Sequence, residues 1–363
     1  MIIALSLIII SGIAVFAFLH QPKFGKMPSE KRLEKIRQSI HYKNGAFQNL
    51  SPTPIMTEGI SYSNVFKDFF FTKNKRPVDR IPSIKTDLLK LDRNKDIMVW
   101  FGHSSYFIQI DGKKILVDPV LSAAASPVPF TTKAFNGTDI YTTDDIPEID
   151  YLFITHDHWD HLDYKTILKL KPKIKKVICG LGVGEHLTCW GYNPDIIVEK
   201  DWNEQLLLDS GFTAYTIPAR HFSGRGFRRN SSLWTSFVLQ TPTIKIFIGC
   251  DGGYDTHFAE AGKKFGEFDV AILENGQYNK SWKYIHMMPE EVLQAANDLH
   301  AKLLFPGHSA KFALANHAWD EPLKRITALN TNNHLSLLTP IIGEEVNLKN
   351  NTQIFSQWWK DLK

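Results

Sequence analysis

Cysteine is scarce in this chain of 363 residues, which contains only Cys179, Cys189 and Cys250. Three is an odd number and too few for a disulfide framework, and none of the three belongs to a CxxC pair. We therefore expect buried or free thiols in a reducing compartment rather than structural disulfide bonds.

A strong charge bias, internal repeats and low-complexity tracts are also missing. The 42 basic and 38 acidic residues give a formal net charge of +4, whereas nucleic-acid binding usually needs a concentrated basic face. No nucleic-acid partner is expected, and the lack of a fixed period excludes a solenoid. The chain is 43% hydrophobic and 22% charged, which is typical of a globular protein with a substantial core.

Charged side chains are absent from the apolar run Met1 to Leu19. At about 1.5 Å per residue, this run is just long enough to cross a thin bilayer. It lacks a basic start, a small-residue cleavage site and a lipobox cysteine, so residues 1–20 are expected to be an uncleaved transmembrane anchor. Because basic residues follow the run, the positive-inside rule predicts a single-pass membrane protein with a cytoplasmic catalytic domain. A cleaved export signal is the alternative.

The composition changes along the rest of the chain. Residues 21–96 mix Pro, Lys, Ser and aromatic residues, with a short charged helical stretch near Glu30 to Ser39, and are expected to form a connecting arm packed on the domain. From residue 97 to 345, short apolar runs alternate with helix-like stretches, which predicts a single α/β domain. Residues 346–363, which include Trp358 and Trp359, are predicted to form a C-terminal helix.

The densest group of metal-competent residues follows the apolar run YLFI, in the segment THDHWDHLD. His156 and His158 are two residues apart and can reach one ion from an irregular turn, while Asp160 and His161 can turn toward a second ion. A single histidine is usually a hydrogen-bonded core residue. Three histidines among acids at the exit of a buried strand would repel one another and lose hydration, so the cluster favours a metal site.

Three more metal-competent residues stand at the ends of apolar strands farther along the chain. His221 ends the segment FTAYTIPARH, Asp251 ends IKIFIGCD, and His308 ends KLLFPGH. The HxHxDH motif cannot complete two coordination spheres alone. These strand-end residues are therefore expected to supply the missing ligands.

HxHxDH followed by strand-end His, Asp and His resembles the metallo-β-lactamase superfamily, over roughly residues 97–338. The resemblance implies a four-layer αββα sandwich with two metal ions at one edge. It places His156, His158 and His221 on the first ion, Asp160, His161 and His308 on the second, and Asp251 between them. Nitrogen and oxygen ligands suit two Zn²⁺ ions, although they also admit iron or manganese.

Within that superfamily, several segments resemble, in the same order, the phospholipase D that hydrolyses N-acyl-phosphatidylethanolamine and its bacterial relatives. These segments are GHSSYFIQIDGKKILVDPVLSAAASP, HDHWDHLD, PARHF, NSSLWTSF, GCDGGYDTHFAEAGKKFGEFD and HMMPEE. The resemblance implies hydrolysis of a phospholipid phosphodiester by metal-bound hydroxide, with Asp251 and His286 as catalytic residues. A histidine that merely packs at a helix entry is the alternative for His286.

Other residues near these motifs could support the site without binding metal. His103 either orients the site or is a satisfied structural histidine, and Asp118 is expected to fix a loop. Asp163 is expected to support a ligand without binding metal. Four arginines near His221 suit either a phosphate head group or a solvated basic loop: Arg220, Arg225, Arg228 and Arg229.

Two further functions compete with phospholipid hydrolysis. The same fold could cleave a lactone or another carboxylic ester, or it could be a non-catalytic membrane-tethered binding protein. A pocket lined by Lys or Arg would favour the phospholipid, and a small closed pocket the ester. The expected partners are a phospholipid substrate and the membrane, with assembly as a homodimer left open.

Overall fold

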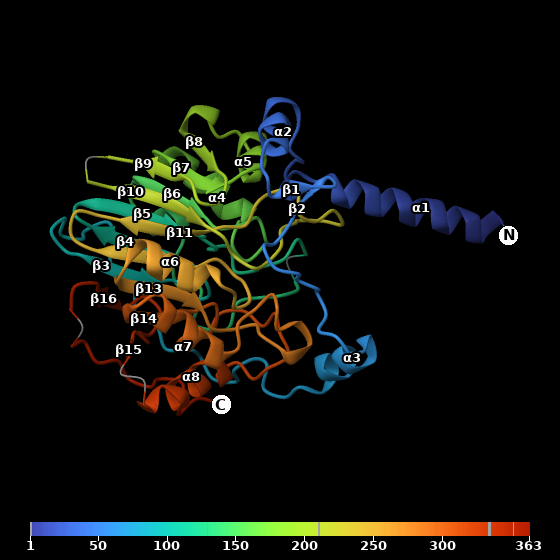
Figure 1. The fold of residues 1–363 in the computed structure, drawn as a ribbon. Coiled ribbons are helices and arrows are strands. Elements are labelled where there is room, and N and C mark those ends of the chain that lie inside the picture. Colours follow the sequence, from blue (N-terminus) through green and yellow to red (C-terminus); the bar gives the residue numbers. More distant parts are fainter. Residues whose placement is uncertain (1, 129, 210, 333–334, 351) are drawn as a thin grey trace.

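Two seven-stranded sheets form the centre of the computed structural model, which describes residues 2–128, 130–209, 211–332, 335–350 and 352–363. The strand order is β16-β3-β4-β5-β6-β7-β8 in the first sheet and β15-β14-β13-β12-β11-β10-β9 in the second (Figure 1). The strands of the first sheet are β3 Ile97–Trp100, β4 Tyr106–Ile110, β5 Lys113–Val117, β6 Tyr151–Ile154, β7 Val177–Gly180, β8 Ile197–Lys200 and β16 Glu345–Asn347. Those of the second sheet are β9 Gln205–Leu207, β10 Thr213–Ile217, β11 Ser236–Gln240, β12 Lys245–Ile248, β13 Phe268–Glu274, β14 Ala301–Gly307 and β15 Ser336–Leu337.

Each sheet is antiparallel along one part and parallel along the other. In the first sheet, β5, β6, β7 and β8 run parallel. In the second sheet, β12, β13, β14 and β15 run parallel, and β10 shares their direction because β11 pairs antiparallel with both β10 and β12. The carboxyl ends of β10, β12, β13 and β14 therefore meet at one edge of the second sheet.

The main hydrophobic core lies between the two sheets, where side chains of both inner faces meet. Phe153 of β6 and Phe237 of β11 are fully buried, and their rings meet edge to face with centroids 5.0 Å apart. Aromatic rings prefer this geometry because the positive edge of one ring faces the negative face of the other. Large inward-facing side chains thus pack the two sheets against each other.

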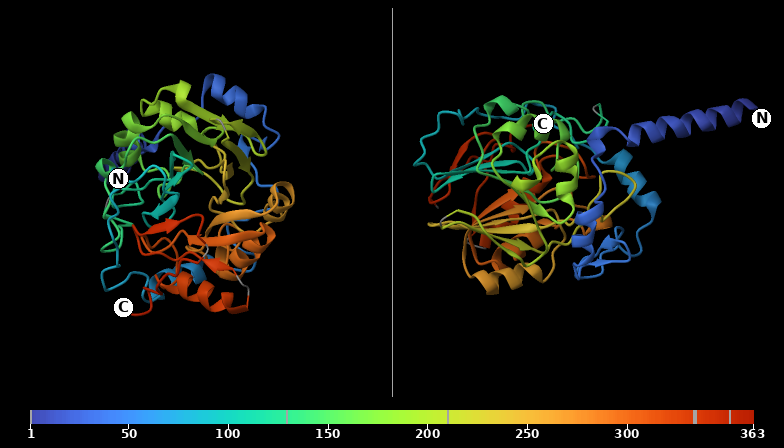
Figure 2. Two further views of the ribbon diagram at one scale, coloured as in Figure 1. Left: turned by 90° about the vertical axis from the view of Figure 1, so that its left-hand side faces the viewer. Right: turned by 90° about the horizontal axis from the view of Figure 1, so that it is seen from above.

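Helices cover the outer faces and complete a four-layer αββα sandwich. The helices α4 Tyr164–Leu170 and α5 Val183–Cys189 pack on the first sheet. The helices α6 His257–Phe265, α7 Pro289–Asp298 and α8 Glu321–Leu329 pack on the second. Figure 2 shows these two groups, green and orange to red, on opposite outer sides of the sheets. The predicted α/β class and four-layer sandwich are confirmed.

The chain before the sandwich contributes several short elements. They are α1 Ile2–Leu19, α2 Glu30–Arg37, β1 Tyr42–Lys43, β2 Ala46–Phe47 and α3 Tyr62–Phe71. One short 3-10 helix, Pro22–Phe24, also belongs to this part of the chain. Others lie later in the chain, at Thr143–Asp145, Lys171–Lys173, Pro194–Ile196, Lys280–Trp282 and Asn330–Asn332. Arg32 of α2 pairs with Glu185 and Glu199 at 2.5 Å each, which ties the arm to the first sheet and its helix α5.

The transmembrane anchor predicted for residues 1–20 is not supported. The helix α1 has 18 residues and extends away from the body (Figure 1). At about 1.5 Å per residue it is roughly 27 Å long, less than the ~30 Å of a bilayer's hydrocarbon core. Among the described residues, no helix has the length and apolar character needed to cross a membrane. The single-pass placement with a cytoplasmic catalytic domain was therefore a wrong prediction.

The C-terminal helix predicted for residues 346–363 was also wrong. The described residues of this segment contain no helix, and its start belongs to strand β16, which pairs with β3. Turns follow, because the asparagine side chains accept hydrogen bonds from nearby backbone: Lys349 N donates to Asn347 at 3.0 Å and Thr352 N donates to Asn350 at 2.9 Å. Two tryptophans at the end, Trp358 and Trp359, are buried in the main core.

Candidate metal centre

The turn that carries the HxHxDH motif is short and held at both ends. It begins where β6 ends at Ile154, and it finishes at Asp163, whose carboxylate accepts hydrogen bonds from two backbone N–H groups of α4. Arg225 is buried against it and donates from Nη1 to the carbonyls of Asp157 and Leu162, at 2.8 and 2.7 Å. Asp163 therefore caps a helix, and Arg225 supports the turn from behind.

Three histidines converge at one side of this turn. His156 Nε2 lies 2.9 Å from His158 Nδ1, and His221 Nε2 lies 3.3 Å from the same His158 atom. Their ligand atoms all fall within 4.8 Å of one another. Imidazole nitrogens at this spacing can point at a single ion.

A second group meets the first at Asp251. His161 Nε2 and His308 Nε2 each lie 3.1 Å from Asp251 Oδ2, and Asp160 Oδ2 is 3.6 Å from His161 Nε2. Asp251 also groups with His156 and His161 within 4.8 Å. The structure thus brings all seven of the expected ligands to one place, with Asp251 between the two groups.

Two buried residues join this cluster that the sequence argument left outside it. His103 donates from Nε2 to Asp160 at 2.9 Å, and Glu274 at the end of β13 accepts from His286 Nδ1 at 2.6 Å. Glu274 also accepts from Met287 N at 2.7 Å. It is a strand-end carboxylate like Asp251, and that signal could have identified it. His103 follows strand β3, and its contact with Asp160 agrees with the orienting role that the sequence left open.

Several contacts orient the rings without occupying the metal-facing atoms. His161 donates from Nδ1 to Asp118 Oδ2 at 2.8 Å, and Asp118 also accepts from Thr155 N at 2.8 Å. His221 donates from Nδ1 to the carbonyl of Ile285 at 2.9 Å. Such partners fix the tautomer of a metal-binding histidine and leave its other nitrogen free. Asp118 therefore supports His161 and fixes a loop.

Burial and mutual repulsion keep four of the imidazoles neutral. Both effects lower the pKa of His156 and His221 well below the usual value, and burial does the same to His308. The pKa of His158 falls to about 4, mainly through burial. Neutral imidazoles are the form that binds metal ions.

The pKa values of Asp251 and His161 are raised, in contrast to those of the four imidazoles above. Burial raises the pKa of Asp251 to about 6, against the lowering effect of His161. The pKa of His161 is raised well above its usual value, because Asp251 and Asp160 outweigh the effect of burial. A divalent cation at this place would satisfy the same carboxylates and imidazoles, and the donor set fits such a cation.

A pocket of about 250 Å³ opens on the cluster. Its walls are largely apolar, and two of the wall residues, Ile55 and Met56, come from the arm. The described residues that line it include no Lys or Arg; they are Ile55, Met56, His158, Asp160, His221, Phe222, Asp251, Gln277, Trp282, Ile285, His286, His308 and Leu314. His286 thus faces the same space as the candidate ligands.

The arginines near His221 do not line this pocket. Arg225 donates to the carbonyl of Lys23 at 2.9 Å in addition to its contacts with the turn, and Arg220 donates to the carbonyl of Pro52 at 2.7 Å. Both guanidinium groups therefore join the arm to the domain. Their interpretation as a phosphate site is not supported by these contacts.

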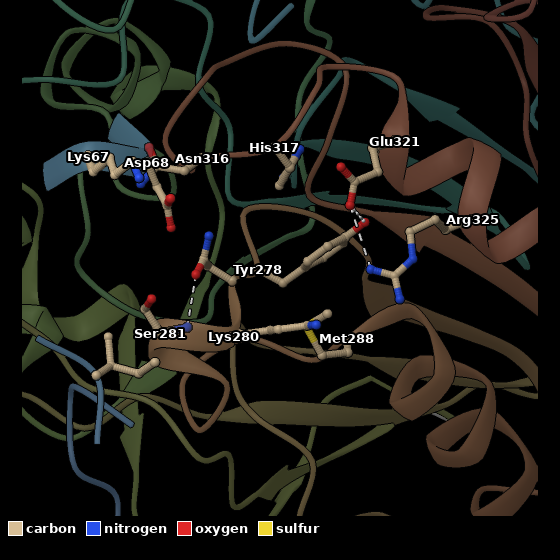
Figure 3. A pocket seen from close by; sticks show the side chains of 12 residues that line it. Lys67, Asp68, Tyr278, Lys280, Ser281, Met288, Asn316, His317, Glu321 and Arg325 are labelled. Atoms are coloured by element: carbon tan, nitrogen blue, oxygen red, sulfur yellow. Dashed lines mark hydrogen bonds and ion pairs between the residues drawn. The ribbon is translucent and has the colours of Figure 1, made fainter. Parts of the chain in front are cut away.

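A larger pocket of about 490 Å³ is lined by other residues of the segment that carries His286 (Figure 3). Tyr278 donates to Glu321 at 3.1 Å on one wall, and Lys67 and Asp68 of α3 form another. Lys280 also lines it. Cationic side chains, with Asp68 and Glu321, thus line a separate pocket, whose residues 278–281 lie in the chain between Gln277 and Trp282 of the metal pocket.

Comparison with known protein families identifies the superfamily of this chain. The family model described as the beta-lactamase superfamily domain matches residues 113–309, more than half of the chain. This chain belongs to that superfamily. The matched range contains all seven expected ligands and His286, and superfamily membership supports a metal-dependent hydrolase.

Relatives within the superfamily extend the likeness. An uncharacterized protein of Mycobacterium tuberculosis is 34% identical over 329 residues, covering 89% of this chain and 88% of that protein. The N-acyl-phosphatidylethanolamine-hydrolyzing phospholipase D 1 of Caenorhabditis elegans is 29% identical over 216 residues, covering 56% of this chain and 60% of that protein. The predicted likeness to this phospholipase group is confirmed.

Solved structures of the superfamily share the fold at low sequence identity. The isothiocyanate hydrolase from Delia radicum gut bacteria has a TM-score of 0.56 and 17% identity, covering 69% of this chain and 98% of that one. At this identity the likeness concerns the fold alone.

Replacement of one of the three clustered histidines should cause the protein to lose bound metal. We expect His158→Ala to lose bound metal, because His158 Nδ1 faces both His156 and His221. Metal content after dialysis, measured by mass spectrometry of the elements, checks this. His20→Ala is the matched control, since His20 is exposed at the end of α1. Equal metal content in both variants would contradict the assigned site.

Metal affinity should fall as the pH drops below about 6. Asp251 has its pKa raised to about 6, so below that pH a metal ion must displace its proton. One displaced proton weakens binding about tenfold per pH unit. Competition with a chelator between about pH 5 and pH 7 measures the slope. Asp251→Asn should reduce the slope by about one proton, because His161, whose pKa is also raised, must still lose its own proton. The same slope in that variant would show that another group carries the effect.

Proposed function

We propose that this chain is a phospholipase of the D type, which hydrolyses the phosphodiester of an N-acylated phosphatidylethanolamine with two divalent metal ions, Zn²⁺ by preference. The observation that carries the proposal is the similarity to the C. elegans enzyme of that name. The seven expected ligands gather in one cluster, and five of them line the same pocket as His286, which agrees with that chemistry. Two such ions lower the pKa of water and neutralise charge that develops on phosphorus.

The protein's own residues supply the proton chemistry at His286. Its Nδ1 lies 2.6 Å from Glu274. When the Glu274 carboxyl group is ionised, Nδ1 donates to it, and Nε2 carries no proton in the neutral ring. Burial lowers the pKa of His286, which keeps the ring neutral near pH 7. Nε2 can therefore accept a proton from a water molecule or contact a phosphate oxygen after protonation. Glu274 fixes the ring orientation from behind.

The pocket walls suit a substrate with apolar groups near the reacting atom. Ile55, Phe222, Trp282 and Leu314 surround the metal-facing side chains. Such walls exclude water and strengthen electrostatic interactions at the site. Lys67 and Lys280 in the neighbouring pocket would suit the anionic part of a phospholipid that extends past His286.

Hydrolysis of a lactone or another carboxylic ester is the second candidate. It is favoured by the modest volume of the metal pocket, about 250 Å³, and by the lack of Lys or Arg among its described lining residues. A neutral ester needs no cationic contact in the ground state, whereas a phosphodiester carries a charge throughout. Assays on both substrate classes therefore separate the two candidates.

Zn²⁺-loaded protein in mixed detergent micelles should convert N-acyl-phosphatidylethanolamine into equal amounts of acyl ethanolamide and phosphatidic acid, read by mass spectrometry. Asp251→Asn should reduce the rate at least ~100-fold, because a carboxylate that bridges both groups is lost. Metal-loaded protein that leaves the phospholipid intact but opens lactones would establish the second candidate instead.

His286→Ala should keep its metal and lose about 100-fold or more in kcat, since a positioned acid or base contributes that much. Metal content and kcat measured on the same sample test this. Trp282→Phe, which keeps an aromatic wall, is the matched control. An unchanged kcat would assign His286 a packing role.

A further inference from the structure

The arm reaches the candidate metal centre from outside the matched family range of residues 113–309. Its residue Asn49 contacts the backbone of His221, one of the three histidines of the first group. We propose that Asn49 is a positioning residue, which sets the backbone of His221 so that its ring faces the first metal position. This inference rests on the metal-dependent function proposed above.

Asn49 binds both polar backbone groups of His221. Its Nδ2 donates to the carbonyl of His221 at 2.7 Å, and its Oδ1 accepts from the N–H of His221 at 3.0 Å. His221 lies beyond the end of β10 at Ile217, where the strand ladder has stopped. The side-chain amide thus satisfies the backbone N–H and C=O of His221, as a neighbouring strand does for a residue inside the sheet.

The ring of His221 is held by a different contact. Nδ1 donates to the carbonyl of Ile285 at 2.9 Å, and Nε2 lies 3.3 Å from His158 Nδ1. The backbone is therefore fixed by Asn49, the ring rotation by Ile285, and only Nε2 is left for a cation. Loss of the Asn49 contact would let the backbone shift, and the ring nitrogen would shift with it.

Asn49 is itself held firmly by the domain. Trp234, which is fully buried, donates from Nε1 to Asn49 Oδ1 at 3.1 Å. Two residues earlier, Phe47 is fully buried in the same cluster as Trp234, and its N–H donates to the carbonyl of Asn230 at 2.8 Å. The arm therefore presents Asn49 from a fixed position.

The two hydrogen bonds between Asn49 and the backbone of His221 require an amide side chain. Asn49 acts as donor to one backbone group and acceptor from another at the same time, which a carboxylate cannot do. Asn49→Asp keeps an acceptor for His221 N and Trp234 but loses the donor to the His221 carbonyl. Asn49→Ala loses both. The two variants form a graded series that removes the contact in steps.

The experiment measures the affinity of the full chain for Co²⁺ and Zn²⁺ by competition with a chelator, together with the visible absorption spectrum of the Co²⁺ form. Asn49→Ala should weaken one of the two metal positions by about 10- to 100-fold, as is usual when a residue that orients a ligand is lost. Asn49→Asp should weaken it in the same direction by a smaller factor. Both should alter the Co²⁺ spectrum, which reports ligand geometry.

Gln48→Ala is the matched control. Gln48 is exposed next to Asn49 in the chain, and among the described contacts its side chain donates only to the carbonyls of Ala46 and Lys43. It should bind metal like the wild type. If it weakened binding as much as Asn49→Ala, the effect would belong to this part of the arm as a whole and the proposal would be wrong.

Wild-type affinity and spectrum in the Asn49 variants would overturn the proposal. If Asn49→Ala does not fold, Asn49→Asp decides alone by the same criterion. Failure of the proposed function is distinguishable, because wild-type protein that binds metal but leaves the phospholipid intact would contradict the substrate only. Metal affinity requires no substrate, so the Asn49 result stands apart from it.

Discussion

The candidate site depends on one electrostatic constraint: neutral imidazoles and carboxylates are buried together where the strands end. Burial lowers the pKa of His156, His221 and His308, and raises that of Asp251 to about 6. Such a cluster is costly in a low-dielectric interior unless something neutralises it. Because the ligand atoms lie within 4.8 Å of one another, a cation can satisfy several of them at once.

The surrounding structure holds these groups against their mutual repulsion. Asp118 fixes His161, Glu274 fixes His286, and Arg225 fastens the turn of the HxHxDH motif. Each support is itself buried and hydrogen-bonded. Buried polar networks of this kind are favourable only when every member has a partner. The sandwich therefore acts as a rigid frame, and the chemistry takes place at the edge that it leaves open.

The arm gives the site features that the matched family range does not contain. Ile55 and Met56 line the metal pocket, Asn49 contacts the backbone of His221, and the carbonyl of Lys23 accepts from Arg225. Substrate choice in this fold is expected to depend on such added segments, because the site residues alone do not select a substrate.

The sequence by itself determined the α/β class and the seven expected ligands, because strand-length apolar runs ending in His or Asp are local patterns. It misjudged residues 346–363, where asparagine turns and pairing of β16 with β3 replaced the expected helix. Only the tertiary structure showed that His103 and Glu274 join the cluster, that Arg225 supports a turn, and that Asn49 reaches His221. These contacts join residues distant in the chain, and local periodicity carries no information about which distant segments will meet.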